Sequence, residues 1–137
     1  MSGSSSTLQV RVRYAETDQM GVVYHTNYLV WCEIGRTEHI ATLGMRYSEL
    51  ETQGVRLAVA DAEIRYHAPA RYDDLLVVET RLESVRSRTV TFSYLISHAA
   101  SGARLVTART TLISLDAHGK PLALPSAVRL RLAGTHA

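Results

Sequence analysis

Residues 27–43 read NYLVWCEIGRTEHIATL, and they decide the fold because they form a long stretch with helical periodicity in a chain that otherwise alternates like strands. Asn27 is suited to the N-cap position, and Gly44 is placed to end the helix in a left-handed conformation. Polar groups gather at Glu33 and over residues 36–38, whereas apolar groups cover a broad surface. Such a helix needs to be wrapped by other parts of the chain. Its apolar positions are Tyr28, Leu29, Val30, Trp31, Cys32, Ile34, Ile40 and Leu43.

Most of the remaining chain has the patterns of β-structure. Residues 8–14 alternate as a half-buried strand, with Leu8, Val10, Val12 and Tyr14 on one face. Four further strands are expected at 56–67, 75–85, 89–98 and 104–115. A short helix is expected over residues 48–53, because Ser48 and Glu51 fit a capping box and Gly54 follows. Residues 118–121 are expected to form a turn, and the residues after 121 a tail or an edge segment.

This order of elements predicts an α+β fold. Consecutive strands at short spacing pair mostly antiparallel, and the long helix must cover one face of their sheet. A long central helix wrapped by a curled antiparallel sheet of five to six strands is the hotdog fold. The chain of 137 residues suits one domain, which we place at residues 8–132 after a disordered leader over residues 1–7.

Composition excludes several classes of protein. No apolar run approaches the roughly 20 residues needed for a membrane span, and the N-terminus lacks a secretory pattern, so a cytoplasmic protein is expected. Net charge is only +2, too weak to indicate nucleic-acid binding, although all but one of the 15 basic residues are Arg. Cys32 is the single cysteine, and its apolar neighbours indicate a buried, inert thiol.

The most informative motif precedes the long helix. Residues 14–28 read YAETDQMGVVYHTNY, with Asp18, Gly21 and an aromatic–histidine pair before Asn-Tyr opens the helix. This run resembles the motif of the 4-hydroxybenzoyl-CoA thioesterase family, especially the bacterial acyl-CoA thioesterases associated with the Tol–Pal system. Residues 66–75, YHAPARYDDL, resemble an inter-strand turn of the same family. The resemblance implies an acyl-CoA thioesterase with its active site at a dimer interface, in a homodimer or homotetramer.

The chemistry of the motif agrees with that resemblance. Asp18 is the candidate catalytic group, either as a nucleophile that forms a mixed anhydride or as a general base for water. The backbone N–H groups of His25, Thr26 and Asn27 are candidates for the oxyanion site, because they lie at a helix start. Gly21 would let the loop turn tightly and let substrate approach the backbone. An ordinary turn capped by Asp18 is the structural alternative.

Three residues near Asp18 each have a functional and a structural interpretation. The His25 imidazole would orient substrate or Asp18, or act only as a polar contact near the helix start. Tyr24 is expected in the catalytic group as a wall of the pocket, with core packing as its alternative. Glu16 is the competing carboxylate. It could form an acid–base pair with Asp18, although pairing with an Arg or exposure to solvent is the stronger expectation.

Coenzyme binding is expected in the turn between two strands. Family members bind CoA phosphates there, and Arg86, Ser87 and Arg88 occupy that position. His67 is a further candidate for substrate binding, and Arg65 and Arg71 are weaker ones. No cofactor is expected. No metal is expected either, because the remaining histidines lack the spacing of metal ligands.

The sequence therefore predicts hydrolysis of an acyl-CoA thioester to a free acid and CoA. An acyl carrier protein is a possible alternative donor of the acyl group. Two other functions stay open. The first is a hotdog hydratase or dehydratase acting on an enoyl or hydroxyacyl thioester, and the second is a non-catalytic module that binds acyl thioesters or an acyl carrier protein.

Overall fold

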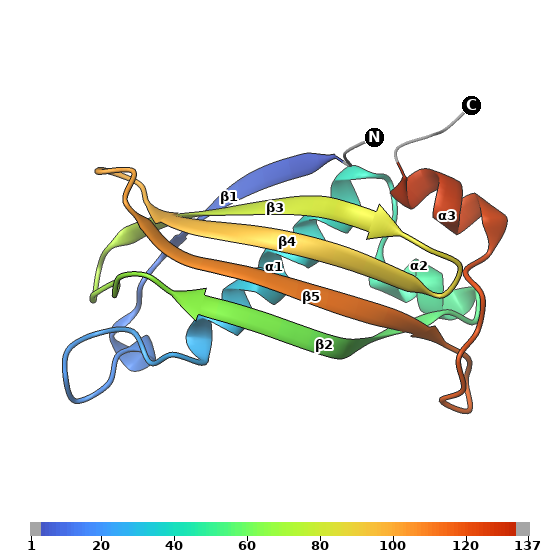
Figure 1. The fold of residues 1–137 in the computed structure, drawn as a ribbon, viewed down its shortest axis with the longest axis horizontal. Helices are drawn as coiled ribbons and strands as arrows, with labels where there is room; N and C mark the ends of the chain where they lie inside the picture. Colours follow the sequence, from blue (N-terminus) through green and yellow to red (C-terminus); the bar gives the residue numbers. More distant parts are fainter. Residues whose placement is uncertain (1–3, 134–137) are drawn as a thin grey trace.

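A five-stranded antiparallel sheet dominates the computed structural model, which describes residues 4–133 (Figure 1). The strands lie in the order β1-β3-β4-β5-β2, so the chain's second strand is placed at the far edge. Three strands begin and end at the residues expected from sequence. The bounds are β1 Ser5–Arg11, β2 Arg56–Tyr66, β3 Leu75–Val85, β4 Thr89–His98 and β5 Arg104–Leu115.

Helix α1, Asn27–Thr42, lies across one face of this sheet (Figure 1). The side chains of Trp31, Cys32 and Ile40 are buried on the helix, and alternate residues of β4, including Phe92 and Ile96, are buried from the sheet. A single hydrophobic core forms between helix and sheet. The hotdog arrangement predicted from the order of elements is thereby confirmed, with five strands in an open sheet.

The first strand lies earlier than the sequence indicated. Strand β1 begins at Ser5, which is opposite Arg81 of β3, so residues 5–7 are paired strand and not leader. Residues 1–3 of the expected leader lie outside the described residues. The strand ends at Arg11, although Val12 still donates its N–H to the carbonyl of Asp74, and a 3-10 helix, η1 (Tyr14–Glu16), follows. Tyr14 was expected on the buried face and is 77% exposed instead.

Glycines end two of the helices as expected, but the start positions differ. Gly44 and Gly54 have φ of +82° and +84°, in the left-handed region that terminates a helix. Helix α1 has Thr26 at its N-cap, and Asn27 is the first helical residue. The expected capping box is wrong, because the short helix α2 (Tyr47–Thr52) starts before Ser48.

The C-terminal segment forms a third helix. Helix α3, Ser126–Leu132, buries Val128 and Leu132 and contacts β3. The prediction of a tail or edge segment was wrong here.

The polar face assigned to α1 was also partly wrong. Arg36 is 5% exposed and points into the interior, where its guanidinium donates to the hydroxyls of Tyr47 and Tyr94. Val30 and Ile34 are 48% and 45% exposed instead.

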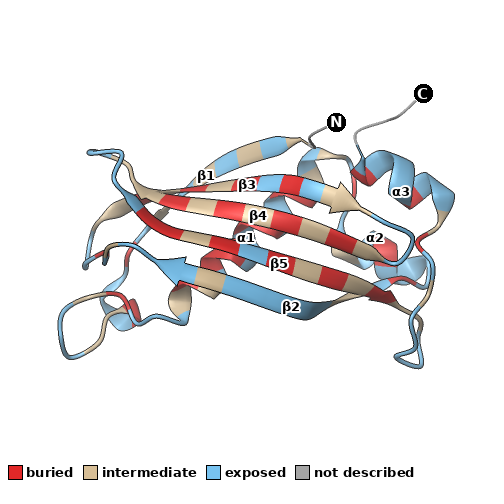
Figure 2. Ribbon diagram, viewed as in Figure 1, coloured by how far each residue is buried: buried red, intermediate tan, exposed pale blue. Residues whose placement is uncertain are grey.

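Strand β2 is an edge strand with little covering it (Figure 2). Among residues 4–133 it pairs only with β5, and it is exposed along most of its length. Helix α1 lies mainly against β1 and β3, whereas β2 contacts the short helix α2. Within residues 4–133, no helix is long and apolar enough to cross a membrane.

Candidate active site

The turn that carries Asp18 is closed by its own backbone. Asp18 donates its N–H to the Val22 carbonyl at 2.8 Å, and Gly21 donates to the Asp18 carbonyl at 3.0 Å. Gly21 has φ of +79°, and nothing lies within 4 Å of the position a Cβ would take. Its left-handed conformation confirms the tight turn expected at this glycine, whereas the approach of substrate to its backbone stays a prediction.

The Asp18 carboxylate is bound within this turn. Its Oδ1 atom accepts the N–H of Met20 at 2.8 Å and that of Val22 at 3.5 Å. Asp116 and Gly119 form the same kind of turn at the other end of the sheet, where Asp116 Oδ1 accepts two backbone N–H groups. The turn alone is therefore not evidence for catalysis. What distinguishes Asp18 is the position of its turn.

That position is fixed by the start of β3 and the start of α1. Val23 donates its N–H to the Ala70 carbonyl at 2.9 Å, and Val22 forms a bridge with Arg71. Tyr24 donates its N–H to the carbonyl of Glu16 at 2.8 Å. The chain then enters α1 after only two more residues, so the Asp18 turn and the helix start share one end of the molecule.

The start of α1 leaves backbone donors available. Within the described residues, neither the N–H of His25 nor that of Thr26 has a hydrogen-bond acceptor. Asn27 differs from its expected role, because its N–H already donates to the Tyr24 carbonyl at 3.0 Å. Free N–H groups at a helix start attract negative charge. Of the three candidates for the oxyanion site, His25 and Thr26 are the two with unused donors.

A shallow depression of about 260 Å³ lies beside this helix start. Tyr66, which the sequence did not single out as a site residue, forms part of its wall and donates its hydroxyl to the His25 carbonyl at 3.0 Å. Asp18, Gly21 and Tyr24 are not among its lining residues, although the Tyr24 ring packs on His25 at 4.6 Å. The lining residues are Val23, His25, Tyr28, Tyr66, His67, Ala68 and Pro69.

Glu16 has a structural position close to the site. Its carboxylate accepts the N–H of Arg13 at 2.8 Å and the indole N–H of Trp31 at 3.3 Å. Burial opposes ionisation of this carboxyl, but the hydrogen bonds and charge of Arg13 outweigh that effect and lower its pKa. Its backbone carbonyl accepts the Asn27 side-chain amide at 2.9 Å. Pairing with an Arg is thus confirmed, and Glu16 ties the loop to α1.

Two further groups, the thiol of Cys32 and the hydroxyl of Tyr28, are poor nucleophiles. Cys32 is fully buried, and this burial raises the pKa of its thiol to about 12. Burial also raises the pKa of Tyr28, whose hydroxyl accepts the N–H of Ala70 at 3.1 Å. Both groups therefore stay protonated near neutral pH.

The turn expected to bind CoA phosphates lies away from this site within one chain. Arg86, Ser87 and Arg88 are exposed after the end of β3, whereas the Asp18 turn contacts residues just before its start. An 11-residue strand separates the two, which is about 35 Å at the usual rise per residue. One chain does not bring them together.

Comparison with known proteins agrees with this arrangement. Residues 12–132 match the model of the thioesterase-like superfamily. The chain belongs to that superfamily. It is 43% identical to YneP of Bacillus subtilis, over 81% of this chain and 80% of that protein. It is 34% identical to the acyl-CoA thioesterase YbgC of Haemophilus influenzae, over 94% and 95%.

A solved structure gives the same result. The DHNA-CoA thioesterase of Staphylococcus aureus is 34% identical, with a TM-score of 0.83 over 88% of this chain and 80% of that one. The family resemblance stated from residues 14–28 is confirmed, and this member of the thioesterase-like superfamily is a thioester hydrolase.

Proposed function

We propose that this thioesterase hydrolyses an acyl-CoA thioester to a free carboxylic acid and CoA. The observation that carries the proposal is the pair of unused N–H groups of His25 and Thr26 at the start of α1, next to the turn that holds Asp18. Donors placed there would stabilise the oxygen of a thioester carbonyl as it gains negative charge. Relatives whose names give acyl-CoA as substrate support that choice of thioester.

Asp18 is the proposed reactive group, through one of two routes. As a nucleophile, a carboxylate oxygen bonds to the carbonyl carbon, the C–S bond breaks, and CoA leaves as a thiolate that takes up a proton. Water then hydrolyses the mixed anhydride. As a general base, Asp18 takes a proton from water while that water attacks the carbon. Because Met20 and Val22 hold Oδ1, the other oxygen, Oδ2, is the one that reacts.

Neighbouring residues complete the proposed site. Gly21 leaves open space for the thioester, the His25 imidazole orients the substrate, and the ring of Tyr24 supports His25. Asn27 contributes through its side chain, which fixes the loop to the helix, more than through its backbone N–H. His67 and Tyr66 line the entrance for the pantetheine arm.

A homodimer is part of the proposal. The unpaired edge of β2 and the exposed side chains of Val59 and Tyr66 on it would be covered by a second copy. An antiparallel contact between two β2 edges would also bring Arg86, Ser87 and Arg88 of one copy toward the Asp18 turn of the other. A pair of such dimers would form a tetramer. Sedimentation of the purified chain checks this step, and a monomer at micromolar concentration would contradict it.

The function is tested by a thiol-release screen across short, long and aromatic acyl-CoAs, together with matching acyl-carrier-protein thioesters. We expect a free thiol and a free acid in equal amounts. A hydratase or dehydratase would change the acyl chain and release no thiol. A non-catalytic module would bind acyl-CoA without turnover. Either result would refute the proposal.

A further inference from the structure

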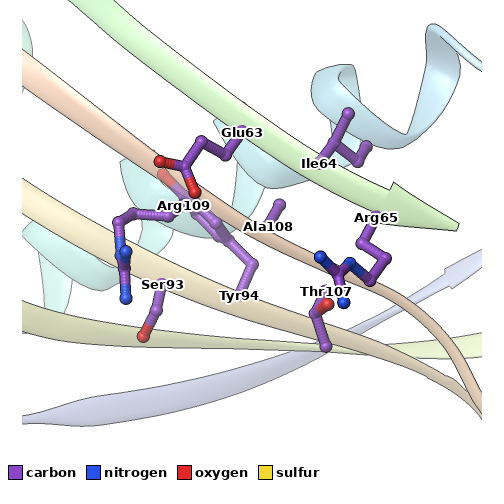
Figure 3. Close-up of a pocket in the computed structure, with 8 residues that line it drawn as sticks. All are labelled: Glu63, Ile64, Arg65, Ser93, Tyr94, Thr107, Ala108 and Arg109. Atoms are coloured by element: carbon purple, nitrogen blue, oxygen red, sulfur yellow. The ribbon is translucent and has the colours of Figure 1, made fainter.

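The outer face of the sheet, away from α1, carries a groove of about 450 Å³ between β2, β5 and β4 (Figure 3). Register places Glu63 opposite Arg109 and Arg65 opposite Thr107 on the two neighbouring strands. Most of the lining groups are polar or charged, so the groove suits a hydrophilic ligand. Its lining residues are Glu63, Ile64, Arg65, Ser93, Tyr94, Thr107, Ala108 and Arg109.

One half of the groove carries more negative charge than positive charge. The Arg109 guanidinium donates to both carboxylate oxygens of Glu83, each at 3.0 Å. Glu63 lies beside Arg109 from the neighbouring strand, as Figure 3 shows, and its charge also acts on that guanidinium. Two carboxylates therefore offset one cation, and this half offers nothing to an anion.

The other half of the groove is lined by one cation, Arg65, and by no carboxylate, and Arg104 and His67 lie just beyond it. Arg65 lies next to Thr107 in Figure 3, and among residues 4–133 neither Arg65 nor Arg104 forms an ion pair. His67 joins them, because its Nε2 atom lies 3.0 Å from the hydroxyl of Thr107 and its N–H donates to the carbonyl of Leu105. We call Arg65, His67, Arg104 and Thr107 the basic patch.

The members of the basic patch are close enough to influence each other. Desolvation lowers the pKa of His67, and the charges of Arg104 and Arg65 lower it further. A bound anion would relieve this repulsion. Arginine forks and a hydroxyl donor are the groups that recognise phosphate oxygens in proteins.

We propose that the basic patch binds the phosphate end of the thioester substrate. This inference rests on the proposed function, because it says where the CoA or carrier-protein part of the thioester substrate binds. His67 belongs both to the patch and to the wall of the depression at the start of α1, so the patch adjoins the entrance of the proposed active site. The pantetheine arm would pass over the end of β2 between them. The turn at residues 86–88 is a different surface at the other end of the sheet.

The shared chemistry is a phosphate ester attached to pantetheine. Coenzyme A offers a diphosphate and a 3′-phosphate, whereas an acyl carrier protein offers a single phosphodiester. Acyl-pantetheine carries the same thioester without any phosphate, and it is therefore the reference substrate.

The test compares the double variant R65Q/R104Q with the wild type on one acyl group carried by CoA, by carrier protein and by pantetheine. We expect the KM for acyl-CoA to rise about tenfold with kcat unchanged, because two exposed charge contacts are lost. The KM for acyl-pantetheine should not change. The matched control is Arg109→Gln, which removes a cation already paired with Glu83 in the same groove and should leave all three KM values unchanged.

The outcomes distinguish the two possible sources of the bound phosphate, CoA and an acyl carrier protein. A rise in KM for acyl-CoA alone assigns the diphosphate or 3′-phosphate, and a rise for the carrier protein as well assigns the phosphodiester. No rise for either, an equal rise for acyl-pantetheine, or the same rise in Arg109→Gln would overturn the proposal. If the wild type releases no thiol, the proposed function fails, and calorimetric binding of CoA to the wild type and to both variants still tests the patch.

Discussion

Gly35 gives a quantitative test of how closely α1 packs on the sheet. A Cβ at this position would lie 3.1 Å from Cγ1 of Val78 and well inside van der Waals contact with Oγ1 of Thr80. Replacing glycine by alanine inside a helix normally stabilises by about 1 kcal/mol. Overpacking costs about 1–3 kcal/mol, and the severity of this contact favours the upper value. We therefore expect Gly35→Ala to destabilise the protein by about 2 kcal/mol, near 7 °C in Tm.

The partner variant Thr80→Ala makes the reasoning testable. Thr80 is buried and its hydroxyl has no hydrogen-bond partner within the described residues, so removing it alone should cost little. In that background Gly35→Ala should be neutral or stabilising, which gives a coupling free energy of about 2–3 kcal/mol. Urea unfolding of the four proteins at one fixed concentration measures it. An equal cost of Gly35→Ala in both backgrounds would refute the packing argument.

Two further substitutions probe the loop around the site. Glu16→Gln should lower the free energy of unfolding by about 1–2 kcal/mol at neutral pH, because an amide cannot accept all the donors that the carboxylate does. Folding lowers the pKa of Glu16 from its ordinary 4.5, so this stabilisation is complete above that value and is lost as the pH falls through the lower folded pKa. The free energies of unfolding of the wild type and of Glu16→Gln, measured from pH 7 to 3, should therefore converge. Parallel curves for the two proteins would contradict the assignment. Tyr28→Phe leaves the Ala70 N–H without its acceptor and should cost about 1–2 kcal/mol in the same unfolding assay, whereas an unchanged Tm would show that the bond contributes nothing.

Periodicity predicted the sheet well because each strand from 75 to 115 has its own turn residues and a clear alternation. The bounds of β3, β4 and β5 followed directly. Strand β1 was misplaced by three residues, because Val12 and Tyr14 continue its alternation although the chain turns away after Arg11. Alternation records which residues could share a face and does not show where the partner strand ends.

The interior of α1 shows a second limit of sequence. Arg36 lies among polar residues along the chain, yet it is buried against the hydroxyls of Tyr47 and Tyr94. Those partners come from α2 and β4, so nothing near Arg36 in the sequence indicated them. Helix α3 was missed for a similar reason, since it depends on burying Val128 and Leu132 against a sheet formed much earlier in the chain.

The candidate site was predicted in part. The motif of residues 14–28 located the Asp18 turn and the helix start, and both lie at one end of the molecule. Tyr66 could have been found from its place in the second family patch, directly before His67. Of the basic patch, the sequence indicates Arg65 and His67 as binding candidates but not Arg104, which comes near them only when β2 pairs with β5.

The central claim is that the Asp18 carboxylate carries out the reaction, and one comparison tests it most directly. Thiol release by Asp18→Asn is measured beside Asp116→Asn, which alters the matching turn far from the site. We expect Asp18→Asn to keep its circular dichroism spectrum and lose about 100-fold or more in kcat, while Asp116→Asn keeps full turnover. Turnover by Asp18→Asn at the wild-type rate would contradict the claim.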